Sequence, residues 1–176
     1  LEITFSMNDG GREGSLISIL DKTQTAMGGR LLKKWISAPL RDLDPINKRH
    51  ESVEELLKNK KVRKDLTENL NEIGDLERLI SRICTSRATP REVVAVKSSL
   101  KKIPALKELL DQLKVSTLKN ISEQLDPLEN IVEKISTAII DSPPAAVNEG
   151  GIIRNGFSPE LDELRDISLH GKAWIS

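Results

Sequence analysis

The sequence predicts a mostly all-α fold, an irregular multi-helix domain with one small β-hairpin near residues 140–155. Apolar residues, mainly Leu and Ile, recur at helical spacing through most of the 176 residues. Aromatic residues make up only 2% of the chain, which argues against a β-sandwich or a barrel. Helix-start signals also recur, the clearest being Thr89-Pro90 with Glu92 in the following turn.

The first residues predict a loop followed by two helices. Residues 1–14 begin with an apolar alternation and continue into Asn, Asp and Gly, so we expect a short extended segment and a loop. A short helix over 15–20 and a stronger one over 25–37 should follow, the second ending before Pro39.

The middle of the chain predicts further amphipathic helices. Asp44 as N-cap and Pro45 at the first helical position should begin one whose apolar face carries His50. Asp75 should cap another. Further helices are expected over 58–70, 76–83, 89–100, 106–113, 117–124 and 127–139.

The last part of the chain predicts a hairpin and a final helix. Pro143-Pro144 forbids a helix, and the Gly150-Gly151 turn beside Ile152 favours a hairpin. A helix beginning at Ser158 has no stop signal, so we expect it to be truncated at the end of this sequence. Its broad apolar arc contains Leu161, Leu164, Ile167 and Trp174. We therefore expect four segments: 1–14, a helical core over 15–139, a hairpin and loop over 140–157, and the start of a long helix over 158–176.

Composition excludes several classes of protein. No apolar run approaches the length of a membrane span, so no membrane partner is expected. A single cysteine, Cys84, excludes an internal disulfide and a multi-cysteine metal site. Net charge is zero, although residues 1–102 carry about +5 and residues 103–176 about −5, which is typical of solvated helix faces.

No catalytic, cofactor-binding or metal-binding residue is predicted. A nucleotide site needs a glycine-rich loop followed by Lys and Ser or Thr, and no glycine pair here has that spacing. His50 and His170 lie on separate predicted helices with no second histidine four residues further on, which argues against a metal site. His50 lies on the apolar face of its helix, so we expect it to be a packed core histidine, and we expect His170 at the surface. Cys84 has no neighbouring base and is interpreted as a small apolar residue. A hydrolase using scattered carboxylates is the weakest alternative.

One basic run is a candidate for contacts with a phosphate backbone, because Lys and Arg position proteins on nucleic acid without reading its sequence. A solvated helix face is the alternative interpretation. The run consists of Lys58, Lys60, Lys61, Arg63 and Lys64.

Residues 20–35 follow the pattern L-D-x-T-x-T-x-M-G-x-R-x-L-K-x-W. This pattern closely resembles the start of the core, or lever, domain (domain III) of the MutS family of DNA mismatch-recognition proteins. Three further blocks agree in order: 39–42, then 74–79 with 89–92, then 151–153 with 156–165. The positions that match are structural ones: Asp21, Thr25, Met27, Gly28, Arg30, Trp35, Asp75, Glu77, Arg78 and Arg91.

The resemblance implies a fragment of a bacterial, cytoplasmic, nucleoid-associated mismatch-recognition ATPase. The fragment would be a scaffold coupling the ATPase domain to the DNA clamp, with no catalysis and no cofactor of its own. ATP and Mg, mismatched duplex DNA, a second MutS subunit and a downstream MutL-like factor would be bound through the full-length parent. The alternative is a free-standing helical module that binds other proteins. We expect Arg78 to have an interhelical role, because its block is part of the resemblance.

Overall fold

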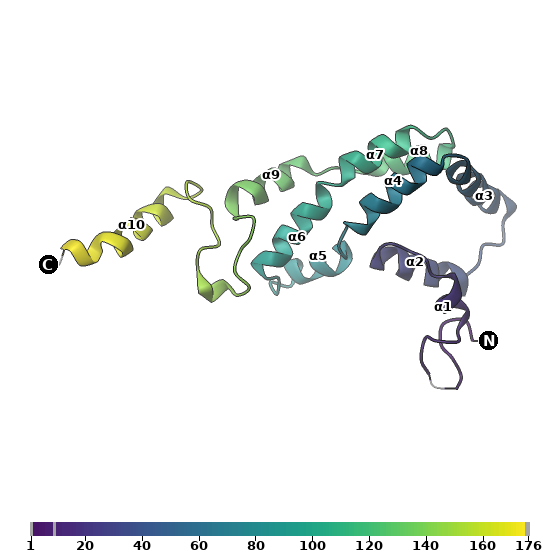
Figure 1. The fold of residues 1–176 in the computed structure, drawn as a ribbon, viewed down its shortest axis with the longest axis horizontal. Helices are drawn as coiled ribbons and strands as arrows, with labels where there is room; N and C mark the ends of the chain where they lie inside the picture. The colour runs from purple at the N-terminus through teal and green to yellow at the C-terminus, as the bar shows by residue number, and fades with distance from the viewer. Residues whose placement is uncertain (1, 9, 175–176) are drawn as a thin grey trace.

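The all-α prediction is confirmed by the structure, a computed structural model that describes residues 2–8 and 10–174, with side chains described up to residue 170. The helical part forms an elongated body with the N-terminal loop near one end and α10 at the other (Figure 1). The helices are α1 (Leu16–Leu20), α2 (Ala26–Ser37), α3 (Leu43–Lys58), α4 (Lys60–Asn71), α5 (Leu76–Cys84), α6 (Pro90–Leu100), α7 (Ile103–Asp111), α8 (Ser116–Gln124), α9 (Glu129–Ala138) and α10 (Pro159–Trp174), with a 3-10 turn at Val147–Glu149.

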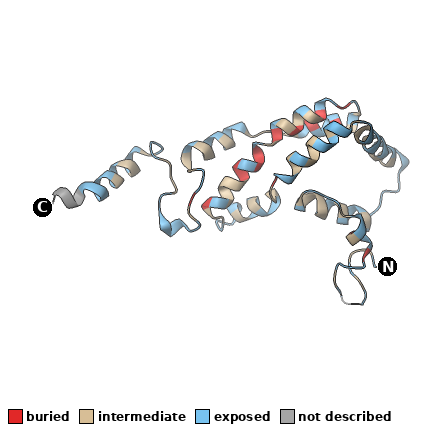
Figure 2. Cartoon of the chain, viewed as in Figure 1, coloured by how far each residue is buried: buried red, intermediate tan, exposed pale blue. Residues whose placement is uncertain are grey.

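Buried residues concentrate in the middle of the body, on α6 and α7 and the residues that follow them (Figure 2). Two clusters make up this core. One joins Ile73, Val96, Leu100, Ile103 and Leu106, and the other joins Leu110, Leu113 and Leu118. Helices pack against neighbours along the chain and against more distant ones: α6 contacts α5 and α9, α7 contacts α4 and α8, and α3 contacts α4 and α8. None of the described helices is long and apolar enough to cross a bilayer.

Two helix starts confirm the capping predictions. The Thr89 hydroxyl accepts from the Glu92 amide at 3.3 Å, and Glu92 accepts in return from the Thr89 amide at 2.8 Å. This reciprocal pair forms a capping box at the start of α6. At α5, the Asp75 carboxylate accepts from the Arg78 amide, as an N-cap should.

Two other predicted starts were wrong. Helix α3 begins at Leu43 with Asp42 as N-cap, so Asp44 and Pro45 lie inside its first turn. Helix α9 begins at Glu129 and not at residue 127, because Leu128 adopts a left-handed conformation with φ of 51°. The Asp126 carboxylate accepts from the Leu128 amide at 2.9 Å and so holds the chain in a turn just before the helix.

The predicted β-hairpin near residues 140–155 is also wrong. A single antiparallel bridge pairs Ile139 with Ile153, and no longer ladder occurs in the described chain between them. Two backbone bonds support it: the Ile140 amide donates to the Ile152 carbonyl, and the Arg154 amide donates to the Ala138 carbonyl. Pairing does not continue toward the turn, where Gly150 and Gly151 have positive φ (74° and 65°) and Pro143-Pro144 has no amide donors.

Candidate functional site

The motif over residues 20–35 covers the end of α1, the connecting residues 21–25 and most of α2. The Thr25 side chain accepts from the Gly28 amide at 3.0 Å, and this bond caps the helix. A Cβ at position 28 would lie only 3.0 Å from Thr25 Oγ1, so glycine lets the cap approach this closely. The cap therefore explains the threonine of the motif, and the tight contact that a Cβ would make with its hydroxyl favours the glycine.

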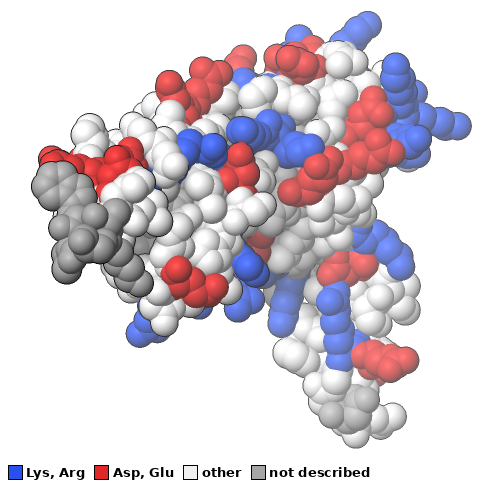
Figure 3. All heavy atoms as spheres, turned by 60° about the vertical axis from the view of Figure 1, so that its left-hand side comes forward, with Lys and Arg blue, Asp and Glu red and all other residues white. Residues whose placement is uncertain are grey.

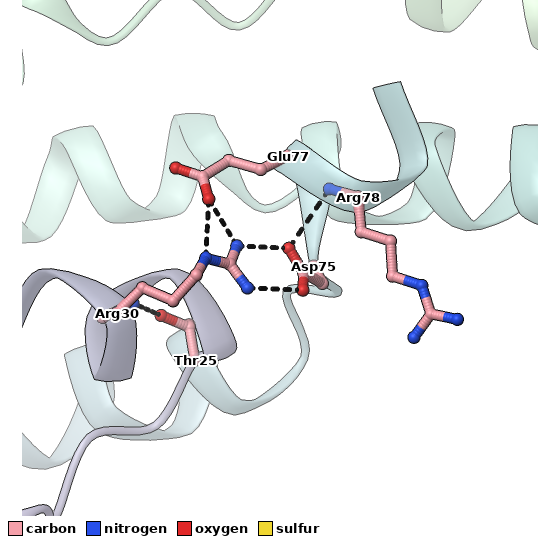
Figure 4. Close-up of polar contacts among 6 residues, drawn as sticks. Thr25, Arg30, Asp75, Glu77 and Arg78 are labelled. Carbon is pink, nitrogen blue, oxygen red and sulfur yellow. Dashed lines mark hydrogen bonds and ion pairs between the residues drawn. The ribbon is translucent and has the colours of Figure 1, made fainter. Parts of the chain in front are cut away.

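Arg30 projects from α2 across to α5, 45 residues further along the chain (Figure 4). Its Nη1 and Nη2 atoms donate to the two carboxylate oxygens of Asp75 at 2.8 and 2.7 Å. Its Nε donates to Glu77 Oε2 at 2.8 Å, and Nη2 also reaches the same oxygen. A guanidinium is suited to this role because its donors are held in a rigid, planar fork. We call Arg30, Asp75 and Glu77 the interhelical latch.

Hydrogen bonding within the latch shifts the pKa values of Asp75 and Arg30, each in the direction that favours its charged form. The bonds from Arg30 lower the pKa of Asp75 from its ordinary 3.8 to about 2. The same bonds, those to Asp75 first and Glu77 second, raise the pKa of Arg30. Arg30 and Asp75 are therefore both charged at neutral pH.

The turn before α5 connects the latch to the core. The buried Ser99 hydroxyl of α6 accepts from the Gly74 amide at 3.0 Å, one residue before Asp75. Arg78 lies on α5, but its side chain is exposed and points away from the carboxylates of Asp75 and Glu77 (Figure 4). The structure thus places Arg30, and not Arg78, between the two helices.

The other motif residues also hold elements together. Asp21 accepts from the hydroxyl and amide of Thr23 at 2.6 and 3.0 Å and from Arg12, and these bonds lower its pKa to about 2. The Arg49 guanidinium of α3 lies 3.5 Å from the centre of the Trp35 ring, a cation–π contact between α2 and α3. Met27 packs against the first core cluster.

Arg91 of α6 has a different partner. Its Nε donates to the Pro143 carbonyl at 3.0 Å and so holds the segment after α9 against α6.

The predicted basic run lies at the junction of α3 and α4, and all five side chains are exposed. Lys58 pairs with Glu54 at 2.5 Å and Lys64 with Glu68 at 3.6 Å. Within the part of the chain that the structure describes, Lys60, Lys61 and Arg63 form no ion pair. On the face shown in Figure 3, basic and acidic side chains are interspersed.

Three residues considered for chemistry lie apart from one another. His50 is exposed, so its prediction as a packed core histidine is wrong: the face of α3 that carries it is not covered. Cys84 and His170 are exposed as well. Among the described residues, no group of three or more His, Cys, Asp and Glu side chains gathers closely enough to hold a metal ion. The charged side chains of this site join elements that are distant in sequence: Arg30 bonds to Asp75 and Glu77, and Arg91 bonds to the Pro143 carbonyl.

The family model of MutS domain III matches residues 1–172. The chain belongs to the MutS domain III family. It is 47% identical to the DNA mismatch repair protein MutS of Symbiobacterium thermophilum, 44% to that of Salinibacter ruber and 43% to that of Listeria monocytogenes. Each match covers the whole of this chain and about a fifth of the relative (20%, 19% and 20%).

Several residues that organise this MutS domain III were not singled out from the sequence. Ser99 was one, and Lys97, Asp141, Arg154 and Arg165 were others. Serine, lysine and arginine are frequent on solvated helix faces, so their positions alone do not signal an interhelical role. The one usable signal was Arg154 and Asp141 standing on either side of the predicted turn.

Proposed function

We propose that this MutS domain III is the helical scaffold of a DNA mismatch repair protein, in which it holds an ATPase and a DNA-binding clamp in register. The latch carries the proposal, because it joins α2 to α5 and, through Ser99, to the core. Such a scaffold needs several helices that move as a unit, and short charge-assisted bonds between distant helices supply that property. The family match favours this function over that of an unrelated interaction module.

The activities of the whole protein belong to the same proposal. ATP and Mg would be bound outside these residues, since the sequence has no phosphate-binding loop, and this chain would catalyse nothing by itself. Mismatched duplex DNA, a second MutS subunit and a MutL-like factor would be the partners, in a bacterial cytoplasm near the nucleoid. The chain would serve as four segments: 1–14, 15–139, 140–157 and 158–176.

A domain exchange tests the scaffold function. The matching segment of the Listeria monocytogenes protein is replaced by this chain, and the hybrid is produced in a strain that lacks its own MutS. We expect the spontaneous mutation frequency to return close to that of the parent strain. Arg30→Gln in the hybrid should raise the frequency again, whereas the matched control Arg78→Gln should not, because Arg78 lies outside the latch.

The scaffold function would be rejected if the hybrid protein accumulates normally but the strain that produces it has the same spontaneous mutation frequency as the strain without MutS. Equal frequencies for the two arginine variants would reject the role of the latch in it.

We also propose that the basic run makes weak phosphate contacts. Lys60, Lys61 and Arg63, which form no ion pair with any residue that the structure describes, lie in the first turn of α4, where the helix dipole already favours an anion. Binding of duplex DNA should be weak, insensitive to a mismatch and steeply reduced by salt. Replacing all three by Gln should weaken it, and Gln at the exposed Lys101, Lys119 and Lys134 is the charge-matched control. A mismatch preference that survives high salt, or equal effects of the two triple variants, would contradict this proposal.

A further inference from the structure

Helix α10 is connected to the bundle by a segment of chain and not by a packed interface. In Figure 1 it lies apart from the other helices. Among the described residues, none of the helix pairs in extensive contact includes α10. Its direction therefore depends on residues 139–158. An unrestrained coil of that length would let the helix wander over roughly 25 Å.

The first restraint on this segment is a buried lysine. The Lys97 side chain, on α6, is 5% exposed, and its Nζ donates to Asp141 Oδ1 at 2.7 Å. The Asp141 side chain is 75% exposed, so burial of Asp141 itself does not hold it at this position. A buried ammonium group needs a counter-charge, and Asp141 supplies it. This pair holds the beginning of the segment against α6.

Arg154 is the second restraint, and it closes the segment on itself. Its Nη2 lies 3.2 Å from Asp141 Oδ2 and donates to the Ile139 carbonyl at 3.2 Å. Its Nε donates to the Ser136 carbonyl at 3.1 Å, and its backbone amide donates to the Ala138 carbonyl at 2.8 Å. The far side of the segment is thereby attached to the last turn of α9.

Arg165 is the third restraint, and it joins α10 to the same stretch. Its Nη2 donates to the Ile153 carbonyl at 2.8 Å and its Nη1 to Asn155 Oδ1 at 2.9 Å. The Gly156 amide donates to Asp162 Oδ2 at 2.6 Å, which binds the turn to the first turn of the helix. Polar contacts therefore run without interruption from α6 through the segment to α10.

We propose that residues 139–158 form a stiff elbow, in which Asp141, Arg154 and Arg165 set the direction of α10 relative to α6 and α9. The mechanical role of the elbow rests on the proposed scaffold function. A stiff joint transmits a displacement of the bundle to α10, whereas a loose one absorbs it. The polar contacts of Asp141, Arg154 and Arg165, and not a hydrophobic interface, determine the geometry of the joint.

Distances across the elbow test the proposal. Spin labels are attached in a Cys84→Ser background through Ser98→Cys on α6 and Ser168→Cys on α10, and pulsed electron–electron double resonance gives the distance distribution. We expect one narrow peak that broadens about twofold or more in Asp141→Asn. Asp166→Asn on α10 is the matched control and should leave the width unchanged. A second label pair, Ser98→Cys with Lys134→Cys, reports whether α6 and α9 remain packed.

If Asp141→Asn also changes the distance distribution of the second label pair, Arg165→Lys is used as the test variant in its place, because Arg165 lies on α10 and not in the bundle. Arg165→Lys keeps the charge but loses the fork that binds Ile153 and Asn155, so the distribution should broaden there too. A broad distribution in the unmodified chain, or a narrow one in Arg165→Lys, overturns the elbow. If the hybrid protein fails to restore repair but the distance distribution is narrow, the scaffold function is rejected and the elbow is not.

Discussion

Ser99 connects the core to the latch through one hydroxyl group, and its removal should be costly. The side chain of this residue is on α6, and the residue is 2% exposed. Its Oγ accepts from the Gly74 amide at 3.0 Å and donates to the Ala95 carbonyl at 2.9 Å. In Ser99→Ala the Gly74 amide loses its acceptor in a partly buried turn. Leaving such a donor unsatisfied costs about 1–3 kcal/mol.

Ser98→Ala is the matched control, because Ser98 is the exposed neighbour on the same helix. Both variants gain the same helix propensity, so their difference isolates the bond to Gly74. Ser98→Ala should change stability by no more than about 0.5 kcal/mol. With a urea dependence of about 2 kcal/mol/M, the unfolding midpoint of Ser99→Ala should fall about 0.5–1.5 M below that of the control. Far-ultraviolet circular dichroism follows the transition.

A double variant shows whether the bond acts on the latch. If Ser99 positions the turn that carries Asp75, the combined loss in Ser99→Ala with Arg30→Gln should be smaller than the sum of the single losses. Midpoints of Ser99→Ala and Ser98→Ala that agree within error would refute the role of the buried hydroxyl. Strict additivity with Arg30→Gln would refute its connection to the latch.

Four further outcomes follow from the structure. Leu113→Ala, at a residue 1% exposed, should cost about 2–5 kcal/mol in urea unfolding, whereas Leu169→Ala on the exposed face of α10 should cost under about 0.5; equal losses would contradict the core assignment. Arg78→Ala should cost only about 0–1 kcal/mol, and a larger loss would restore the interhelical role predicted for it. Ser86 ends α5 with φ of 54°, so Ser86→Gly should raise stability by about 0.5–1 kcal/mol, and a lower melting temperature would be the contrary result. Because the pKa of Asp75 is lowered to about 2, the contribution of its carboxylate to the free energy of unfolding is complete above about pH 4 and is lost as the pH falls toward 2. In Asp75→Asn the free energy of unfolding should therefore depend less on pH between about 4 and 2, and an unchanged pH dependence would contradict this prediction.

Local sequence signals predicted most of the helices, but they were wrong where two local structures were both compatible with the sequence. The Thr89 cap and the Asp75 cap were predicted correctly, because an N-cap bond spans only three residues. Pro127 looked equally suitable as a helix start, but the Asp126 turn delayed the helix to Glu129. The hairpin failed for a related reason. Turn residues near position 150 permit a reversal of the chain, but Gly150 and Gly151 have positive φ and Pro143-Pro144 has no amide donors, so no ladder forms.

Burial of individual residues was harder to predict than helices. An apolar arc on α3 correctly predicted a helix but wrongly predicted a buried His50, because an amphipathic face is buried only where a neighbouring helix covers it. On α10, Leu164 and Ile167 are 63% and 58% exposed for the same reason. The side chain of Trp174, predicted on the same arc, lies outside the described residues.

The sequence by itself determined the helical class, the family and the motif positions that include Arg30, Asp75 and Glu77. Spacing of apolar residues and capping pairs act within one or two turns, so they can be recognised without knowing the fold. Only the tertiary structure decided which charges meet. Arg30 and Arg78 both belong to blocks that match the family. Of these two, the Arg30 guanidinium reaches Asp75 and Glu77 and the Arg78 guanidinium points away, because an ion pair depends on the distance between side chains and not on separation along the chain.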